Sequence, residues 1–213
     1  MDSGLLQKLE ARGRKYVFVS NIDNMSGTAD LNILNKMYKE NKEYGLEVTR
    51  KTRADVKGST LVWYENNYRL VEVAKVPRDR KWQETVKQKS MFNTNNVWVS
   101  MSGIRRVVER GFRDMEVNVN SKTLRTGVTI LQLETGVASP VKVFQDSLIV
   151  NIPRSRFLPV KKTCDLMLVM SNLYTLEKGT LIMSPDRVYQ TTPVVELGDE
   201  HFKKVRCFSS ILE

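Results

Sequence analysis

The stretch KYVFVSNIDN, residues 15–24, decides the fold class of this 213-residue chain. Its apolar residues, Tyr16 to Val19, predict a short strand that is buried on both faces, and the polar residues after it predict a turn. From Thr28, the expected N-cap, apolar residues recur at helical spacing and predict a helix that ends near residues 41–45. Strand, turn and helix in this order form the unit of an α/β sheet.

Further strands and helices are expected along the rest of the chain. The expected strands are 46–49, 60–64, 68–73, 92–100, 115–119 and 128–133, and the expected helices are 103–110 and 165–174. Asn66-Asn67 tolerates the positive φ of a tight turn, so strands 60–64 and 68–73 are predicted to form a hairpin. This order mixes βα units with antiparallel pairs. It predicts an α/β fold with a mixed sheet flanked by helices, without an internal repeat or a linker.

Composition limits the classes to which the chain can belong. With 41% hydrophobic and 27% charged residues, it fits neither the disordered nor the low-complexity class. No apolar run approaches the roughly 18 residues of a membrane span. Cys164 and Cys207 are far apart and lack neighbouring metal ligands, which favours reduced thiols over a disulfide or a zinc site. We therefore expect a folded cytoplasmic protein without a membrane partner.

The net charge of +10 raises phosphate-rich partners as candidates: nucleic acid, anionic lipid or a phosphorylated substrate. The basic run at 75–89 is most simply a solvated loop. A second basic cluster, at 154–162, is interleaved with apolar residues, so Lys161 is expected to be held beside a core. No RNP-like aromatic tract or helix-turn-helix pattern occurs, so we expect no nucleic-acid partner.

Three positions could carry chemistry. Asp23 follows the end of an apolar strand, where a carboxylate could hold Mg²⁺ against substrate phosphates, or could be an ordinary strand-exit residue. The tract FNTNNVW at 92–98 crowds three amides and a hydroxyl between Phe and Trp, which suits sugar hydroxyls or a capped turn. Glu134 follows a predicted strand, and a surface salt bridge is the simpler interpretation there.

Five tracts in a fixed order carry a family pattern. They are KYVFVSNIDN at 15–24, VTRKTRADVKGSTL at 48–61, FNTNNVW at 92–98, LQLET at 131–135 and PRSRFLPVKKTCDLMLVMSNLY at 153–174. Together they resemble the eukaryotic UDP-glucose pyrophosphorylases, also called UTP–glucose-1-phosphate uridylyltransferases, over nearly the whole chain. The UDP-N-acetylhexosamine pyrophosphorylases share this architecture, but the NTNN and RSRFLPVK tracts favour the glucose enzyme.

The resemblance implies a fold and a reaction. The fold is a Rossmann-like, glycosyltransferase-A-type mixed sheet. The reaction is a nucleotidyl transfer in carbohydrate metabolism, glycogen synthesis included: UTP and glucose 1-phosphate form UDP-glucose and pyrophosphate, with Mg²⁺ as the cofactor. One divalent cation and a fixed ammonium can neutralise the charge that builds up during this transfer, without a covalent enzyme intermediate.

The resemblance also implies roles for individual residues. Six positions match substrate-binding residues of the family: Asn21, Ile22, Asp23, Lys57, Asn95 and Glu134. Among these, Asp23 would coordinate the magnesium, Asn95 would hold the glucose with Glu134 near the same hydroxyls, and Lys57 would lie at the rim of the active site. Lys161 matches the catalytic lysine, which reaches the phosphates.

Two features of the family have no counterpart in this sequence, namely the N-terminal glycine-rich loop that cradles the triphosphate and a Gly-His-Gly segment. The family's C-terminal left-handed β-helix is not matched either. We therefore expect residues 1–213 to be a partial nucleotidyltransferase catalytic domain whose turnover, alone, is undetectable. Ser26 and Ser59 also stand where the family usually has Gly.

A non-catalytic relative is the main alternative. Such a protein would bind UDP-glucose weakly, or would associate with a full-length homologue as a pseudo-subunit. In-frame sequence upstream of Met1 that encodes a glycine-rich loop would favour the enzyme over this alternative.

Overall fold

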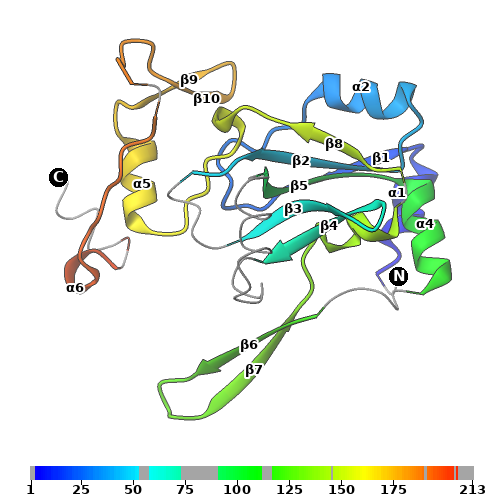
Figure 1. Cartoon of the computed structure of the whole chain (residues 1–213), viewed down its shortest axis with the longest axis horizontal. Helices are drawn as coiled ribbons and strands as arrows, with labels where there is room; N and C mark the ends of the chain where they lie inside the picture. The colour runs from blue at the N-terminus through cyan, green and yellow to red at the C-terminus, as the bar shows by residue number, and fades with distance from the viewer. Residues whose placement is uncertain are drawn as a thin grey trace. The chain divides into compact units, whose positions relative to one another are not determined.

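The computed structural model describes residues 3–52, 58–72, 91–111, 117–144, 146–189, 191–203 and 205 (Figure 1). The backbone divides into two compact units. The first consists of Met1–Val19, Asp30–Lys51 and Asp55–Asn151, and the second of Ser20–Ala29, Thr52–Ala54 and Ile152–Glu213.

The first unit is built on a six-stranded sheet. Its strands are β1 (Tyr16–Val19), β2 (Tyr44–Arg50), β3 (Ser59–Tyr64), β4 (Asn67–Glu72), β5 (Met91–Ser100) and β8 (Leu148–Asn151). The order is β4-β3-β5-β2-β8, and β1 pairs with β5. Only β2 and β8 run parallel, whereas the other described pairs are antiparallel. The mixed sheet predicted from the sequence is therefore confirmed, although β8 was not among the expected strands.

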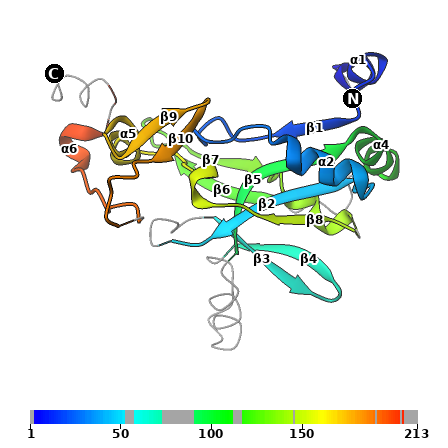
Figure 2. The ribbon, with the colours of Figure 1, turned by 90° about the horizontal axis from the view of Figure 1, so that it is seen from above.

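The most enclosed strand is β2, because β5 and β8 pair with its two edges (Figure 2). Every residue from Tyr44 to Thr49 is buried, and Tyr44, Leu46 and Val48 belong to the main apolar core. The prediction that β1 is buried on both faces was wrong, since all four of its residues are only half-buried. The reason is that β1 pairs with β5 alone among the described strands.

Among the described residues, three helices accompany this sheet: α1 (Leu5–Ala11), α2 (Leu31–Lys39) and α4 (Met101–Arg110). The N-cap of α2 is Asp30, whose carboxylate accepts a hydrogen bond from Asn32 N at 2.8 Å. The prediction that Thr28 caps this helix was wrong. Its hydroxyl and carbonyl oxygens instead accept hydrogen bonds from the Arg156 guanidinium.

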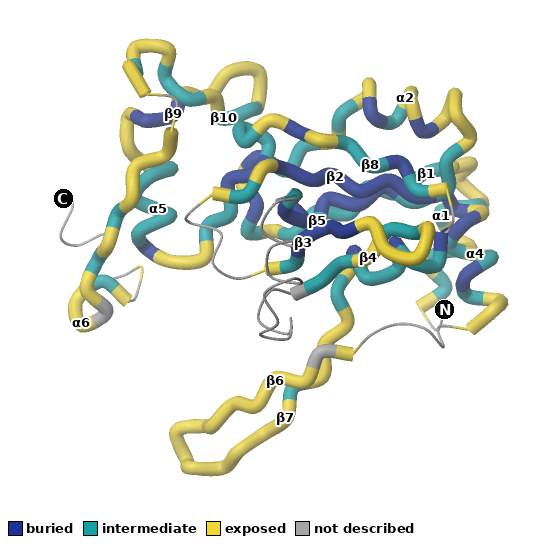
Figure 3. The backbone as a smooth tube through the Cα atoms, viewed as in Figure 1, coloured by how far each residue is buried: buried dark blue, intermediate teal, exposed yellow. Residues whose placement is uncertain are grey.

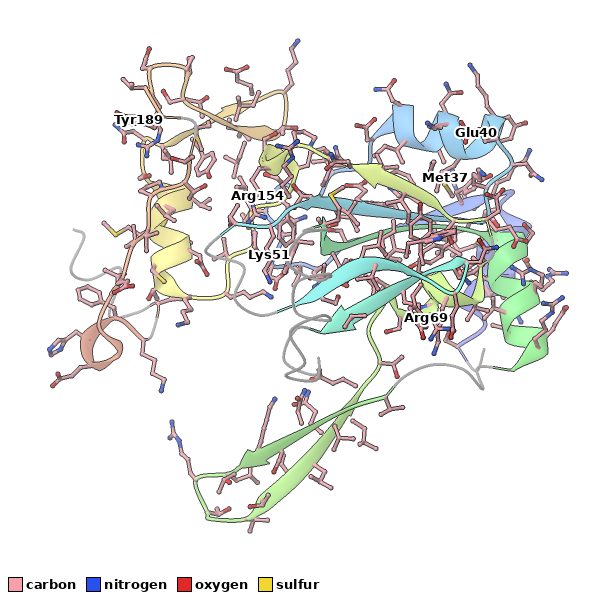
Figure 4. The ribbon with its side chains drawn as sticks, viewed as in Figure 1. Met37, Glu40, Lys51, Arg69, Arg154 and Tyr189 are labelled. Carbon is pink, nitrogen blue, oxygen red and sulfur yellow. The ribbon has the colours of Figure 1, made fainter. Side chains whose placement is uncertain are left out.

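Met37 lies on the side of α2 that faces the strands and is fully buried (Figure 4). Its sulfur approaches the backbone of Gly45 in β2, where a Cβ would lie 2.7 Å from Met37 Sδ. A side chain at position 45 would therefore push α2 away from the sheet. The helix packs closely here because residue 45 is glycine.

The hairpin of β3 and β4 turns one residue earlier than expected. Glu65 and Asn66 have φ values of 48° and 59°, the pattern of a two-residue type I′ turn. Asn67, expected in the turn, instead pairs with Tyr64 as the first residue of β4. Its side chain donates to the Lys142 carbonyl at 2.9 Å, which fixes it in the strand.

A separate two-stranded sheet is formed by β6 (Asn118–Thr123) and β7 (Thr129–Glu134). Most of its residues are exposed (Figure 3). The strand predicted at 128–133 is confirmed as β7. The strand predicted at 115–119 begins outside the described residues; Val117 is described but is not in a strand, and β6 starts at Asn118. A 3₁₀ helix, Ser139–Val143, precedes β8.

The second unit contains a 3₁₀ turn (Arg154–Arg156), α5 (Thr163–Met170), the hairpin of β9 (Tyr174–Glu177) and β10 (Thr180–Met183), and α6 (Asp199–Phe202). The predicted helix at 165–174 was too long, because the Ser171 hydroxyl bonds to the Leu168 carbonyl and the Leu173 N–H, which ends the helix. Leu158, Leu173 and Tyr174 form a small core. Over the described ranges, no helix is both long and apolar enough to cross a membrane.

Candidate functional site

Asn24 organises the turn that carries Asp23 in the second unit. Its side chain is buried, accepts a hydrogen bond from Leu158 N at 2.9 Å and donates to the Arg156 carbonyl at 3.2 Å. An isolated antiparallel bridge also joins Asn24 to Pro159. The polar turn after β1 is thereby tied to the segment that leads to Lys161.

Asp23 and Lys161 are brought together at the level of the backbone. Val160 N donates to Asp23 O at 2.8 Å, so Lys161 directly follows a residue that is bonded to Asp23. The other side of Lys161 is fixed by Asp165, whose Oδ2 accepts hydrogen bonds from the N–H groups of Lys161 and Lys162, each at 2.9 Å. The fold thus holds a carboxylate and an ammonium on adjacent pieces of backbone.

Lys161 itself is exposed, whereas the neighbouring Phe157 and Leu158 are buried. The expectation that Lys161 is held beside a core is therefore wrong for its side chain, because burial in this segment stops at Phe157 and Leu158. In the part of the chain that is described, its ammonium has no ion-pair partner. The guanidinium of Arg154, which Figure 4 labels, lies over the Phe157 ring, 5.0 Å from the centre of that ring.

The Asp23 carboxylate fits a magnesium ion that is shared between the protein and a phosphorylated ligand. Asp23 is half-buried, and no described residue donates a hydrogen bond to its carboxylate. Within the same residues, no group of three or more His, Cys, Asp or Glu side chains could hold a metal. Mg²⁺ commonly binds through one or two carboxylates plus substrate phosphates and water. Asp23 therefore fits a cation that arrives with a phosphorylated ligand.

The two residues before Asp23 differ in environment. Asn21 is half-buried, and its carbonyl accepts a hydrogen bond from Asn24 N at 3.0 Å, which closes the turn. Ile22 is fully exposed at the tip of the turn. Its backbone and side chain are both open to a ligand.

In the first unit, Asn95 lies in a β-bulge of β5 and is half-buried. Its backbone is left-handed, with φ at 59°. The Asn93 side chain accepts from Asn95 N at 2.9 Å and donates to Asn95 Oδ1 at 2.8 Å. Among the described residues, none accepts a hydrogen bond from the Asn95 NH₂ group, which can donate to a ligand hydroxyl, the chemistry expected of a sugar contact.

Glu47 lies opposite Asn95 in the paired strand, and the sequence did not single it out. It lies in β2 beside the bulge, its side chain is fully buried, and both of its carboxylate oxygens accept hydrogen bonds from β5. Glu47 is the single acidic residue in the stretch YGLEVTR, and a carboxylate between the apolar residues Leu46 and Val48 was the available signal.

Glu134 and Lys57 complete the predicted set. Glu134 is exposed in β7, where it accepts hydrogen bonds from Asn120 at 3.3 Å and from Gln132. The sheet of β6 and β7 pairs with no other described strand, and no hydrogen bond links Glu134 to Asn95. Lys57 lies outside the described residues.

Comparison with known proteins identifies relatives across the whole chain. The family described as UTP–glucose-1-phosphate uridylyltransferase matches residues 1–213. UTP–glucose-1-phosphate uridylyltransferase 2 of Dictyostelium discoideum is 46% identical over 206 residues, which is 96% of this chain and 41% of the relative. The enzyme of Solanum tuberosum is 47% identical over 210 residues, 98% of this chain and 44% of its own length. The chain thus spans less than half the length of these relatives.

Solved structures agree with these sequence matches. UDP-glucose phosphorylase from Trypanosoma brucei superposes with a TM-score of 0.84 at 29% identity, over 98% of this chain and 48% of that one. A mutant UDP-glucose pyrophosphorylase from Leishmania major in complex with UDP-glucose gives a TM-score of 0.80 at 31% identity, over 97% and 47%. The fold class expected from the five tracts is therefore confirmed, and it covers about half of these structures. The chain belongs to the UTP–glucose-1-phosphate uridylyltransferase family.

Proposed function

We propose that the chain contributes sugar- and phosphate-binding residues to the formation of UDP-glucose and pyrophosphate from UTP and glucose 1-phosphate. The observation that carries this proposal is the hydrogen bond from Val160 N to Asp23 O, which holds a magnesium-type carboxylate next to the backbone of Lys161. Asn95, with its amide free to donate, suits a sugar hydroxyl. UDP-glucose presents both hydroxyls and phosphates.

The chemistry divides between these residues. A phosphate oxygen of glucose 1-phosphate attacks the α-phosphorus of UTP, a new P–O bond forms, and the bond to the leaving pyrophosphate breaks. Bound Mg²⁺ would neutralise phosphate charge, and Asp23 would hold it. The Lys161 ammonium lies at the exposed end of a fixed backbone segment and would stabilise the same charge as a point cation. We propose a cytoplasmic location and a supply of UDP-glucose for glycogen synthesis.

A catalytically inactive relative that binds UDP-glucose weakly, or that joins a full-length homologue, is the second candidate. Turnover with UTP, glucose 1-phosphate and Mg²⁺ distinguishes the two. Measurable turnover supports the enzyme, whereas saturable UDP-glucose binding without turnover supports the inactive relative.

The experiment that tests the site is a calorimetric titration of UDP-glucose with and without Mg²⁺. We expect Mg²⁺ to tighten binding to the unaltered chain. Asp23→Asn should bind as well as the unaltered chain without Mg²⁺ and gain nothing from its addition, because its assigned role is coordination. Asp146→Asn is the matched control, since Asp146 is an exposed carboxylate that pairs with Lys42. An equal magnesium effect in all three proteins would refute the role of Asp23.

A further inference from the structure

Strands β2 and β5 lose their regular register next to Asn95. Leu46 pairs with Val97, and Val48 pairs with Asn93, so the residues Thr94, Asn95 and Asn96 lie opposite the single residue Glu47. Such bulges re-aim a side chain and are frequent beside functional sites. Here the residue at the centre of the bulge is the candidate sugar ligand.

The conformation of Asn95 needs support from its surroundings. A φ of 59° is left-handed, which is unfavourable for residues other than glycine, although Asn tolerates it better than most. If φ of Asn95 returned to the ordinary negative range, the side-chain amide would point in another direction. The left-handed conformation therefore needs contacts that fix the residues on either side of Asn95.

Glu47 holds both neighbours of Asn95. On one side, Thr94 Oγ1 donates to the Glu47 carbonyl at 2.6 Å. On the other side, Asn96 Nδ2 donates to Glu47 Oε2 at 3.0 Å, while Trp98 Nε1 donates to Oε1 at 2.9 Å. A buried carboxylate accepts several such hydrogen bonds, and each is stronger than a bond between neutral groups.

We propose that Glu47 is a positioning residue that fixes the left-handed backbone of Asn95 and thereby aims its amide at a sugar hydroxyl. The inference rests on the proposed function, because it takes Asn95 as the sugar contact. Glu47 is fully buried and acts through Asn96, Trp98 and its own carbonyl, without touching the ligand.

Glu47→Gln is the decisive variant because it keeps the shape of the side chain. A glutamine has one accepting oxygen and one donating NH₂ group, so it cannot accept from both Asn96 and Trp98. The NH₂ group of the glutamine would then face the N–H donor of Asn96 or of Trp98 in a buried place, and one of these hydrogen bonds would be lost. Glu43→Gln is the matched control, because Glu43 has the same charge but forms an ion pair with Arg106 at the start of β2.

The first readout is the affinity for UDP-glucose. Glu47→Gln should weaken binding by roughly fivefold, as Asn95→Ala does, because both remove the same aimed hydrogen bond. The double variant Glu47→Gln/Asn95→Ala should bind no more weakly than Asn95→Ala alone. Glu43→Gln should bind as the unaltered chain does. Additive losses in the double variant would mean that Glu47 has only a general structural role and would overturn the inference.

The second readout does not require a ligand. Nuclear magnetic resonance couplings and ¹³C shifts report the φ angle of Asn95 directly. In Glu47→Gln, Asn95 should leave the left-handed region or average over it, while Glu43→Gln retains a positive φ. If both variants keep a positive φ at Asn95, Glu47 does not position it. If the unaltered chain binds no UDP-glucose, the proposed function fails, and this readout still decides the role of Glu47.

A milder variant covers the case in which Glu47→Gln does not fold. Trp98→Phe keeps an aromatic ring against Phe18 and removes only the N–H group that Glu47 Oε1 accepts. It should weaken UDP-glucose binding by roughly threefold and broaden the signals of Asn95. Unchanged binding together with an unchanged φ at Asn95 would contradict the inference.

Discussion

The hydroxyl groups of two serines, Ser26 and Ser59, have different surroundings. Ser59 Oγ accepts a hydrogen bond from Asn93 at 3.0 Å, and the same amide holds Asn95. Ser26 is completely buried, and its Oγ has no hydrogen-bond partner in the described structure. One serine therefore extends the polar group around the candidate sugar ligand, and the other leaves a buried hydroxyl unsatisfied.

This difference gives opposite expectations for alanine at the two positions. Ser26→Ala should raise the free energy of unfolding by about 1 kcal/mol, because it removes an unsatisfied buried hydroxyl. Ser59→Ala should lower it by up to about 1 kcal/mol, because Asn93 then loses a partner. Chemical denaturation followed by circular dichroism measures both. A destabilised Ser26→Ala protein would show that the hydroxyl has a partner in solution.

The sequence revealed the types of the site residues but not their neighbours. Asp23 and Lys161 were predicted from separate tracts, and only the fold shows that Val160 bonds to Asp23. Glu47 was missed, because a single acidic residue in a strand normally indicates a solvent-facing position. Its partners, Asn96 and Trp98, lie on a different strand, and no local pattern connects them to Glu47.

At the scale of elements, the long and regular segments were predicted best. Strand β5 and helix α4 lie within one or two residues of their expected bounds, because their patterns are extended and strong. The burial of β1 on both faces was predicted wrongly. Burial depends on how many neighbours a strand has, and among the described strands β1 has one neighbour whereas β2 has two. The end of α5 was missed because Ser171 stops it through side-chain hydrogen bonds.

The cap of α2 provides a test at this scale. Asp30→Ala should lower the free energy of unfolding by about 1 kcal/mol, since the Asn32 N–H loses its acceptor at the helix start. Hydrogen exchange at the first turn of α2 should become faster. Thr28→Ala is the comparison, because Thr28 bonds to Arg156 and should leave the exchange of α2 unchanged. Faster exchange in Thr28→Ala alone would restore Thr28 as the cap.

At the scale of the whole molecule, two apolar surfaces lack cover among the described residues. One edge of β1 pairs with no strand, and three apolar residues on one face of the β6–β7 hairpin are exposed: Val119, Leu131 and Leu133. Unpaired strand edges and isolated hairpins recruit other chains. The net charge of +10 opposes such contacts, but salt screens it.

We therefore expect the chain to self-associate, and more strongly at high salt than at low salt. Sedimentation velocity over a range of protein concentrations measures this directly. Leu131→Lys and Leu133→Lys, made together, should reduce association if the hairpin face contributes. A monodisperse monomer at all concentrations and both salt levels would contradict this expectation.

The central proposal is that Asn95 contributes an amide hydrogen bond, and Lys161 a cation, to the binding of UDP-glucose. The most direct test is a titration of UDP-glucose at two salt concentrations with the unaltered chain, Asn95→Ala and Lys161→Ala. Asn95→Ala should weaken binding by about 1 kcal/mol at either salt concentration, because the lost hydrogen bond is neutral. Lys161→Ala should weaken binding more at low salt than at high salt, since salt screens the attraction between the ammonium and the phosphates. Equal losses at both salt levels for the two variants, or no saturable binding by the unaltered chain at millimolar ligand, would contradict the account.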